Sequence, residues 1–280
     1  MRAQELKEKT TWCIFDLDGT LLTTEKRLQA ETIKNILALR KKGIRYTLAS
    51  GRQDKMMRHY AHLLKVEEPL ISSNGAMLKD KEPSRITPIP EEVLQDFLAY
   101  LDDYGLSYFL YGVDLVFHKG ETKYIERFNL YNRLAKSSGT EILPVLPIEE
   151  RQVTMPILKV YVRLHSLDDQ KPIIDWLHTY NQKHSQTILQ GLMSGGLGLD
   201  VMEASVGKGK MLETLEKNLD IDPATVVVFG DEENDLGMFE QAGFTFAMRN
   251  ATPAVKAAAD LVAPSNNAGG VPRMLQQWIL

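Results

Sequence analysis

Residues 12–20 read WCIFDLDGT, a run of four apolar residues that leads directly into two aspartates. The run is long enough for a short buried strand, and Asp16 and Asp18 follow it with only Leu17 between them. Two ionised carboxylates ~4 Å apart at an effective dielectric constant of ~20 repel each other by ~4 kcal/mol. Two acids at the end of a buried strand therefore indicate a positively charged partner.

The same pattern, an apolar run that stops at small or polar residues, recurs three more times. The recurrences are IRYTLASGR at 44–52, PLISSNG at 69–75 and TVVVFGDEEND at 225–235. Parallel strands that are buried on both faces read as continuous apolar runs of this kind. Ligands of such sheets bind beyond the carboxyl ends of the strands, so we expect the four polar clusters to meet there.

A helical pattern separates the first two of these runs. Ile33, Ile36, Leu37 and Arg40 have the i, i+3, i+4, i+7 spacing of one helix face, and Gly43 stands where a helix-terminating glycine is expected. Strands that alternate with helices predict an α/β fold with a doubly wound parallel sheet, similar to a Rossmann fold.

Residues 84–192 lack this pattern and are too many for a loop in a compact domain. We assign them to an inserted α+β domain, and residues 1–83 and 193–280 to the core. The segments expected in the insert are a helix over 93–101 that Gly105 stops, a hairpin of 107–112 and 114–118, a helix over 124–134, a strand over 157–165, a helix over 173–177 and a strand at QTILQ, 186–190. The core pattern resumes at GLDVMEA, 198–204, and continues with a helix from Lys208 and strands near FTFAM and LVA.

Composition narrows the classes of function. The 280 residues are 44% hydrophobic and 25% charged with a net charge of −4, which suits a globular protein and argues against a nucleic-acid partner. The start MRAQELKEKT lacks an apolar signal region, and no stretch approaches the ~20 apolar residues of a membrane span. We therefore expect a cytoplasmic protein without an obligate protein partner. Cys13, the single cysteine, lies in the first apolar run and is expected in the core.

The acids at the strand ends predict a metal site. Asp16, Asp18, Asp231 and Asp235 offer only oxygen ligands, with Glu232 and Glu233 beside them, and such a set favours Mg²⁺. For DLDGT alone, a turn with Asp18 and Gly19 at its tip is the ordinary explanation. The second acidic cluster at another strand end makes the metal site the better one.

Other residues at the same ends suit a phosphate group. Ser50 and Gly51 precede a segment with helical character, where a hydroxyl and backbone amides can bind an anion, although Ser50 is equally suited to cap that helix. Lys208 stands in a first helical turn, where a cation opposes the helix dipole unless an anion is drawn there, and Lys210 is a rival two positions on. Asn74 with Gly75 is as typical of a hairpin turn as of a substrate contact.

These motifs together resemble the haloacid dehalogenase superfamily of phosphohydrolases, and in particular its Cof-type branch. The four motifs of that superfamily are similar to FDLDGTLL at 15–22, LASGR at 48–52, Lys208 in VGKGKML at 206–212 and GDEENDLGMF at 230–239. The segments AMRNATPAVKAAA, 247–259, and NNAGGV, 266–271, also resemble that branch. The departures are Ser50, where threonine is common, and Ala268, which replaces an acid before the final Gly-Val.

The resemblance implies a phosphatase that hydrolyses small phosphate monoesters such as sugar, nucleotide or cofactor phosphates. Asp16 would attack phosphorus to form an aspartyl-phosphate, and Asp18 would protonate the leaving oxygen and later accept a proton from water. Mg²⁺ would be held by Asp16, the backbone carbonyl of Asp18, and Asp231. Ser50, the Gly51 amide and Lys208 would bind the phosphate oxygens, and this role favours Lys208 over Lys210.

The resemblance further implies a C2-type cap for residues 84–192, which would close over the site and select the leaving group. Leu17, Asn74 and Asn234 are expected among the residues that contact the phosphate or substrate, and Asp235 is expected to orient ligands, waters or Lys208. Two alternatives stay open at this point. A phosphotransferase or mutase uses the same intermediate, and a phosphate-sensing module would combine the same residue types without turnover.

Overall fold

The chain divides into two compact units. The computed structural model describes residues 3–79, 84–120, 122–152, 155–186, 188–194 and 196–280. The first unit contains Met1–Arg52, Met57–Ser84 and Gly207–Leu280, and the second contains Gln53–Met56 and Arg85–Val206. Each unit has its own sheet and its own apolar core.

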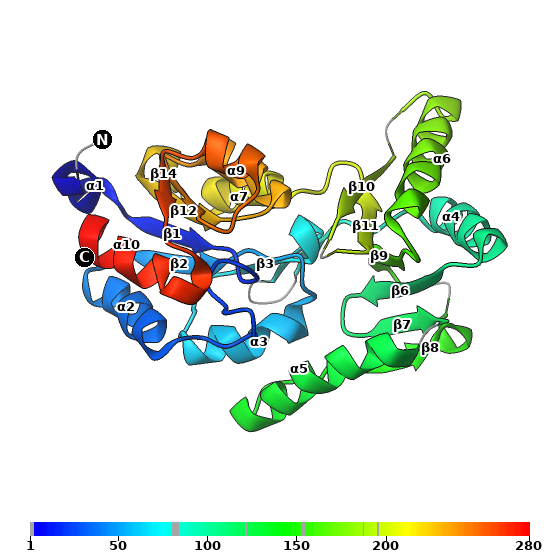
Figure 1. The fold of residues 1–280 in the computed structure, drawn as a ribbon, viewed down its shortest axis with the longest axis horizontal. Helices are drawn as coiled ribbons and strands as arrows, with labels where there is room; N and C mark the ends of the chain where they lie inside the picture. Colours follow the sequence, from blue (N-terminus) through cyan, green and yellow to red (C-terminus); the bar gives the residue numbers. More distant parts are fainter. Residues whose placement is uncertain (1–2, 80–83, 121, 153–154, 187, 195) are drawn as a thin grey trace. The chain divides into compact units, whose positions relative to one another are not determined.

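The first unit is built on a five-stranded parallel sheet (Figure 1). Its strands are β1 (Trp12–Phe15), β2 (Arg45–Leu48), β12 (Val226–Gly230), β13 (Phe244–Met248) and β14 (Leu261–Ala263), in the spatial order β14-β13-β12-β1-β2. The chain moves outward from β1 to β2 on one side and from β12 to β14 on the other, so the order reverses between β1 and β12. This confirms the predicted doubly wound sheet and locates its topological switch point, where such folds bind ligands.

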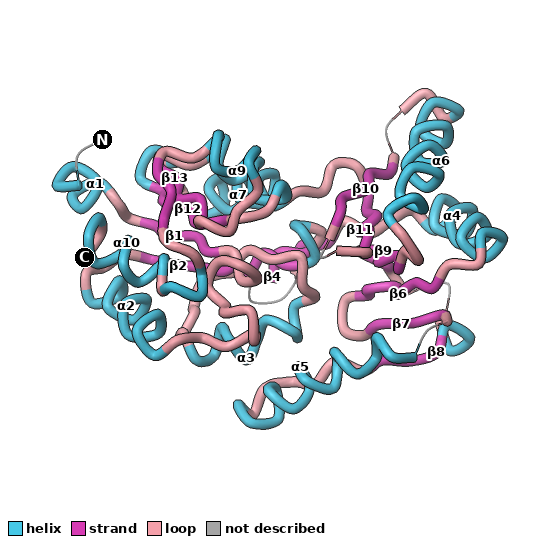
Figure 2. Tube along the Cα trace, in the orientation of Figure 1, coloured by secondary structure: helices cyan, strands magenta, loops and turns pink. Residues whose placement is uncertain are grey.

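Helices cover both faces of this sheet (Figure 2). On one face, the apolar cluster around Trp12 and Ile14 includes side chains from α7 (Lys208–Leu219), α8 (Leu236–Gln241) and α9 (Pro253–Ala258). On the other face, Trp278 of α10 (Gly270–Trp278) lies with its ring near those of Phe244 and Phe246. The helices α2 (Ala30–Lys41) and α1 (Ala3–Lys9) pack against α10. The sheet is therefore packed between helices on both of its faces.

The helix predicted before β2 exists, but its buried face is rotated from the predicted one. The buried side chains of α2 are Thr32, Asn35, Ile36 and Leu39. Arg40 is exposed and forms an ion pair with Glu67, so it does not extend the apolar stripe. Asn35 is accommodated in the buried face because its side-chain amide donates to the backbone carbonyl of Glu31.

PLISSNG also differs from the prediction. Its strand, β3 (Leu70–Ser72), pairs antiparallel with β4 (Met77–Lys79) and meets the extension of β2 only at the parallel bridge between Ala49 and Ile71. The segment after β2 leads into α3 (Asp54–Leu63). The hairpin interpretation of Asn74 and Gly75 is therefore correct for the backbone, because the 3₁₀ turn Ser73–Gly75 joins the two strands.

The second unit is an α+β structure with a six-stranded sheet. Its strands run in the order β10-β11-β9-β6-β7-β8, all antiparallel except the β7–β8 pair. The bounds of these strands are β6 (Ser107–Gly112), β7 (Val116–Lys119), β8 (Val145–Pro147), β9 (Ile157–Arg163), β10 (Leu189–Met193) and β11 (Gly198–Glu203). The helices are α4 (Glu91–Tyr104), α5 (Ile125–Ser138) and α6 (Gln170–Lys183), and the short strand β5 (Arg85–Ile86) is not part of the six-stranded sheet. Side chains of α4 and α6 share one apolar cluster with the sheet, and those of α5 share another.

Two details of this unit differ from the sequence-based expectations. The strand expected at 186–190 is β10, which begins at Leu189 and continues to Met193; residue 187 lies outside the described residues. The core was predicted to resume at residue 193 and therefore to include GLDVMEA, 198–204. In the structure this segment contains β11, which pairs with β9 and β10. Residues 193–206 thus belong to the second unit in the structure.

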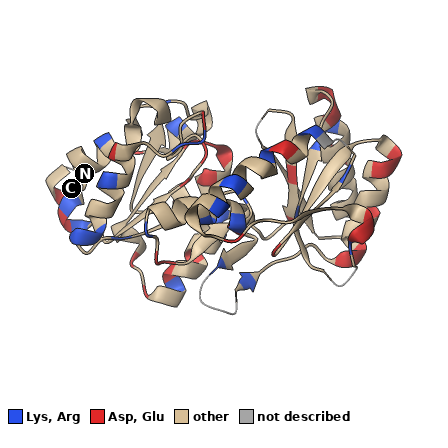
Figure 3. Ribbon diagram, turned by 90° about the horizontal axis from the view of Figure 1, so that it is seen from below, with Lys and Arg blue, Asp and Glu red and all other residues tan. Residues whose placement is uncertain are grey.

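Neither sign of charge is confined to one unit. Acidic and basic residues are interspersed along both units (Figure 3). Within the described part of the chain, no helix is both long enough and apolar enough to cross a bilayer.

Candidate active site

Asp16 and Asp231 come together because the strands that they follow, β1 and β12, are neighbours in register. Phe15 pairs with Phe229, and the amide of Asp16 donates to the Phe229 carbonyl at 3.0 Å. Asp16 follows β1 directly and Asp231 follows Gly230 at the end of β12, and both are about 95% buried, with exposures of 5% and 4%. Carboxylate oxygens of Asp16, Asp231 and Asp235 lie within 4.8 Å of one another. Residues more than 200 positions apart thus form one acidic cluster.

Lys208 supplies a cation to this cluster. Its Nζ donates to Asp16 Oδ1 at 2.6 Å and to Asp235 Oδ1 at 2.7 Å, and the side chain is almost fully buried. Lys208 is the first residue of α7, and Gly207 precedes it as the N-cap. Lys210 instead is exposed and pairs with Glu213 at 2.8 Å. The structure therefore separates the two rival lysines by position.

Asp235 is held on both carboxylate oxygens. Oδ1 accepts from Lys208, while Oδ2 accepts from the backbone amides of Asp231 at 2.9 Å and Glu232 at 3.2 Å. The close approach needs Gly230, because a Cβ there would lie 2.6 Å from Asp235 Oδ2. Asp235 thus orients the loop that contains Asp231 and the ammonium group of Lys208.

Asp231 is fixed by the loop that follows β1. Its Oδ1 accepts from the hydroxyl of Thr20 at 2.6 Å, and its Oδ2 lies against Gly19, where a Cβ would be only 2.0 Å away. Gly19 has φ +82°, a region that glycine enters without strain. The amide of Asn250 donates to the Gly19 carbonyl at 2.8 Å and keeps this loop in place.

Asp18 lies outside the three-acid cluster. Arg52 holds its carboxylate at two points, and Nζ of Lys26 donates to Oδ1 at 2.6 Å. Burial opposes the charge, but Arg52 and Lys26 together bring the pKa of Asp18 well below its usual range. The side chain of Asp18 is therefore an ionised carboxylate between two cations.

The remaining predicted contacts are brought close by the hairpin after β3. The backbone N–H of Asn74 donates to the Ser50 carbonyl at 3.0 Å. The side chain of Asn74 accepts, through Oδ1, from Nδ2 of Asn234 at 2.9 Å. A Cβ on Gly51 would lie 2.7 Å from Asn74 Oδ1, so glycine permits this approach. Ser50 is buried, and its hydroxyl accepts from the amide of Arg52 at 3.3 Å. The side chain of Leu17 is fully buried, so it offers a ligand only its backbone.

The acidic cluster has an excess of negative charge. Three carboxylates face one ammonium group. Mainly because of burial, the pKa of Asp16 is raised to about 7 and that of Asp231 to about 8. The other carboxylates raise both pKa values further, whereas Lys208 lowers them. Asp235 is saturated with hydrogen bonds, so Asp16 and Asp231 present the oxygens that suit a hard divalent cation.

Sequence reasoning missed four residues of this region: Thr20, Lys26, Arg52 and Asn250. Thr20 and Arg52 stand inside the quoted motifs, but only the folded chain shows that they contact Asp231 and Asp18. Asn250 stands in the segment 247–259 that resembles the family, but no role was assigned to it there. No sequence signal pointed to Lys26, which contacts Asp18 eight residues away.

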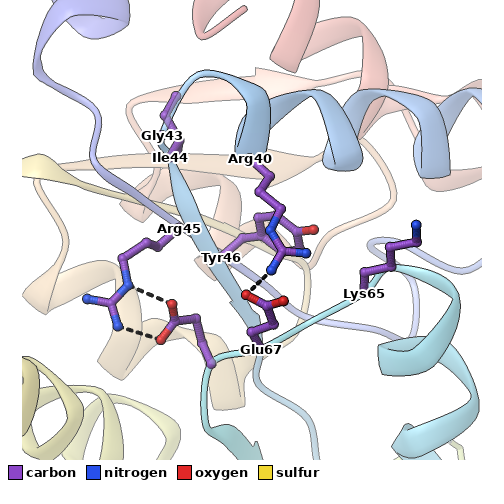
Figure 4. Close-up of a pocket in the computed structure, with 8 residues that line it drawn as sticks. Arg40, Gly43, Ile44, Arg45, Tyr46, Lys65 and Glu67 are labelled. Carbon is purple, nitrogen blue, oxygen red and sulfur yellow. Dashed lines mark hydrogen bonds and ion pairs between the residues drawn. The ribbon is translucent and has the colours of Figure 1, made fainter.

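A separate cavity of about 140 Å³ lies at the amino end of β2 (Figure 4). Among the charged residues of its wall, Arg45 pairs with Glu68 at 2.6 Å and Arg40 pairs with Glu67. Since the acidic cluster follows the carboxyl ends of the strands, this cavity is at the opposite edge of the sheet.

Comparison with known proteins finds consistent similarity over the whole chain. The family model described as haloacid dehalogenase-like hydrolase matches residues 13–275. The 5-amino-6-(5-phospho-D-ribitylamino)uracil phosphatase YitU of Bacillus subtilis is 26% identical, over 94% of this chain and 96% of its own. The pyridoxal phosphate phosphatase YbhA of Escherichia coli is 24% identical, over 95% and 97%. The structure of a haloacid dehalogenase-like hydrolase from Bacteroides thetaiotaomicron has a TM-score of 0.80 at 22% identity, over 96% and 99%.

Proposed function

Because the chain belongs to the haloacid dehalogenase-like hydrolase family, we propose that this phosphatase hydrolyses small phosphate monoesters with Mg²⁺ through an aspartyl-phosphate on Asp16. The observation that supports this most directly is the placement of Asp16. One of its oxygens is bound by Lys208, while the carboxylate shares a buried cluster with Asp231 at the switch point of the sheet. A nucleophile at that point can be reached by a phosphate that lies beyond the strand ends.

The residues present fit a divalent cation. Asp16 and Asp231 would hold Mg²⁺ together with the backbone carbonyl of Asp18, and all three donors are oxygens. The bound ion would supply positive charge that shields the nucleophile from the phosphate it approaches. Thr20 and Gly19 keep Asp231 in position, and Asp235 keeps Lys208 in position.

In the first step, a carboxylate oxygen of Asp16 attacks phosphorus, the bond from phosphorus to the leaving oxygen breaks, and the leaving oxygen takes a proton from Asp18. The ammonium group of Lys208 favours the carboxylate form of Asp16 and can bind a non-transferring phosphate oxygen. Ser50, the amide of Gly51 and the side chain of Asn234 are proposed to bind the remaining phosphate oxygens, together with Asn74 and the backbone of Leu17. The hydroxyl and amide donors suit an anion.

In the second step, water attacks phosphorus, Asp18 accepts its proton, and the bond to Asp16 breaks to release inorganic phosphate. The ion pairs with Arg52 and Lys26 keep Asp18 ionised, which suits this base role. Asp18 can act as an acid in the first step only if the bound substrate displaces one of these cations. We therefore assign Arg52 and Lys26 a positioning role at Asp18.

We propose that the second unit, which contains all of the predicted cap 84–192 except Ser84, selects the leaving group. Its separate sheet and core, formed largely by the chain segment between β4 and α7, support such a division of labour. Replacing residues 85–206 of the second unit by a short linker should reduce turnover of large phosphate esters far more than it reduces Mg²⁺ binding. Equal turnover of large esters by the shortened chain would contradict the cap role.

The decisive experiment is a screen of sugar, nucleotide and cofactor phosphates with and without Mg²⁺, run beside Asp16→Asn. We expect release of inorganic phosphate to require Mg²⁺ and to fall at least about 10³-fold in the variant, because an amide cannot form the acyl-phosphate. An added acceptor alcohol in the same reactions tests transfer, since a phosphotransferase would phosphorylate it. Undiminished release by Asp16→Asn would reject Asp16 as the nucleophile.

A further inference from the structure

The second unit contains two guanidinium groups without a carboxylate partner. Arg127 lies on α5 and Arg163 ends β9. Among the residues that the structure describes, no carboxylate lies within 4.0 Å of either group, and both side chains are only half-exposed. Paired arginines are the usual state of half-buried guanidinium groups, so two unpaired ones in one place need a reason.

The two groups converge on one aromatic ring. The guanidinium carbon of Arg163 lies 4.8 Å from the ring centroid of Tyr124, and that of Arg127 lies 5.2 Å from it. Arg127 also lies 5.3 Å from the ring of Tyr161 and 5.7 Å from that of Phe128. Such cation–π contacts use the faces of the rings and leave the N–H edges of a guanidinium available for a two-point contact with an oxyanion.

The rings themselves are held in place. Tyr161 is 4% exposed and its hydroxyl donates to that of Tyr124 at 3.2 Å, so the Tyr124 hydroxyl keeps its own proton for another acceptor. Tyr161 lies directly over Gly198 of β11, where a Cβ would be 2.4 Å from the ring and 2.5 Å from the hydroxyl oxygen. The absence of a side chain at Gly198 thus sets the position of Tyr161.

An acid on the neighbouring strand β11 is already engaged. Asp200 pairs with Tyr161 across β11 and β9, and its carboxylate contacts Nζ of Lys159 at 3.0 Å. Lys159 in turn lies 4.7 Å from the ring centroid of Tyr111. The charge of Asp200 is therefore matched by Lys159, and no ion pair within the described residues matches the positive charges of Arg127 and Arg163.

We propose that Arg127, Arg163 and the hydroxyl of Tyr124 form an oxyanion site that binds a phosphate or carboxylate group. Two sources have this chemistry: a second anionic group on the part of the substrate that is not transferred, and free inorganic phosphate. The assignment to substrate rests on the proposed function, whereas anion binding itself does not. A site of this kind would favour phosphate esters that have a further negative charge.

Anion binding is tested without turnover by NMR of the full chain labelled with ¹⁵N-arginine, in the absence of Mg²⁺. The Nε–H signals of Arg127 and Arg163, assigned through Arg127→Lys and Arg163→Lys, should shift on addition of inorganic phosphate. The signal of Arg133, an exposed arginine on the same helix, should stay in place. If neither the Arg127 nor the Arg163 signal moves, the proposal is overturned, whatever the activity of the enzyme.

The source of the anion is decided by kinetics on a sugar bisphosphate and the matching monophosphate. Arg127→Lys should lower the ratio of the two kcat/KM values roughly tenfold, because a two-point contact to a charged group becomes a single one. Arg133→Gln should leave that ratio unchanged. An NMR shift with a lowered ratio assigns the site to the substrate, and a shift with an unchanged ratio assigns it to free phosphate. If the unsubstituted chain hydrolyses neither ester, the proposed function is rejected. The NMR result then decides the anion site by itself.

Discussion

The guanidinium of Arg52 holds the carboxylate of Asp18 at two points, Nε to Oδ2 at 2.5 Å and Nη2 to Oδ1 at 2.7 Å. Arg52 is 6% exposed and stacks on the ring of Tyr60, whose hydroxyl donates to the carbonyl of Lys26. The proposed acid–base residue is thus positioned by a buried side chain that has its own contacts. This arrangement is specific to the folded chain, since 34 residues separate the partners.

Arg52→Lys should lower kcat roughly tenfold, because lysine keeps the charge but cannot hold Asp18 at two points. Steady-state kinetics with a small phosphate ester measures the effect. The matched control is Arg45→Lys on the same chain segment, where Arg45 makes an equivalent two-point contact with Glu68 at the opposite end of β2. The same loss of kcat in both variants would contradict a specific role of Arg52.

Lys208→Arg should lower turnover by about 10²-fold while the protein stays folded. The ammonium group has 2% exposure and two short hydrogen bonds, so a larger guanidinium cannot take the same position between Asp16 and Asp235. Circular dichroism checks the fold and phosphate release measures the rate. Lys210→Arg should change neither, because Lys210 is exposed and pairs only with Glu213. Equal activity of the two variants would remove Lys208 from the mechanism.

Gly19→Ala should weaken activation by Mg²⁺ at least about tenfold, because its Cβ would lie 2.0 Å from Asp231 Oδ2 and displace that carboxylate. The positive φ of +82° adds about 1 kcal/mol of strain. Gly43→Ala separates the steric displacement from the backbone strain. Gly43 has φ +75°, but no atom lies within 4 Å of the place that a Cβ would take. It should lose a similar amount of stability and keep its Mg²⁺ dependence. The measurements are rate against Mg²⁺ concentration and thermal unfolding.

Asp231→Asn should stabilise the metal-free protein by about 1 kcal/mol at pH 8.5 and abolish the rise in Tm on addition of Mg²⁺. Burial and the neighbouring Asp16 raise the pKa of Asp231 to about 8, so its ionised form is costly without a cation. Thermal unfolding with Mg²⁺ or with EDTA provides the comparison. Glu240→Gln, at an exposed position of α8, should retain the wild-type response. A full Mg²⁺ response in Asp231→Asn would exclude Asp231 as a ligand.

Glu216 should make the fold less stable as pH rises. Burial raises the pKa of Glu216 from 4.5 to about 7, and its Oε1 has no hydrogen-bond partner. A raised folded-state pKa means that the favourable contribution is complete below pH 4.5 and is lost as pH increases through 7. We therefore expect Glu216→Gln to raise the free energy of unfolding by about 1 to 2 kcal/mol at pH 8.5 and to have little effect at pH 4.5.

The control for that prediction lies one turn away on α7. Lys210 and Lys217 lower the pKa of the partly exposed Glu213 to about 2, so Glu213 contributes stability above pH 4.5 that is lost toward pH 2. Glu213→Gln should therefore have a small effect of the opposite sign at pH 8.5. Urea unfolding at the two pH values tests both variants. A gain in stability at pH 8.5 from Glu213→Gln would show that the effect is not specific to burial.

The sequence by itself predicted the elements whose patterns are local. The apolar runs of β1, β2 and β12, the helix ended by Gly43 and the aspartates that follow the strands could all be recognised, because strand burial and helix periodicity leave a record over a few residues. The choice of Lys208 over Lys210 needed the family resemblance. Where the signal was weak, the prediction failed in detail, as with the rotated face of α2, or left alternatives open, as with the hairpin that pairs β3 with β4.

Only the tertiary structure decided which charges meet. The register between β1 and β12 places Asp16 beside Asp231, and the loop after β1 brings Asp18 between Lys26 and Arg52. In the second unit, the packing of α5 on the sheet brings Arg127 and Arg163 to one tyrosine ring. Electrostatic interactions act through space over a few ångströms, whereas sequence patterns report neighbours along the chain, so these partnerships have no local signature.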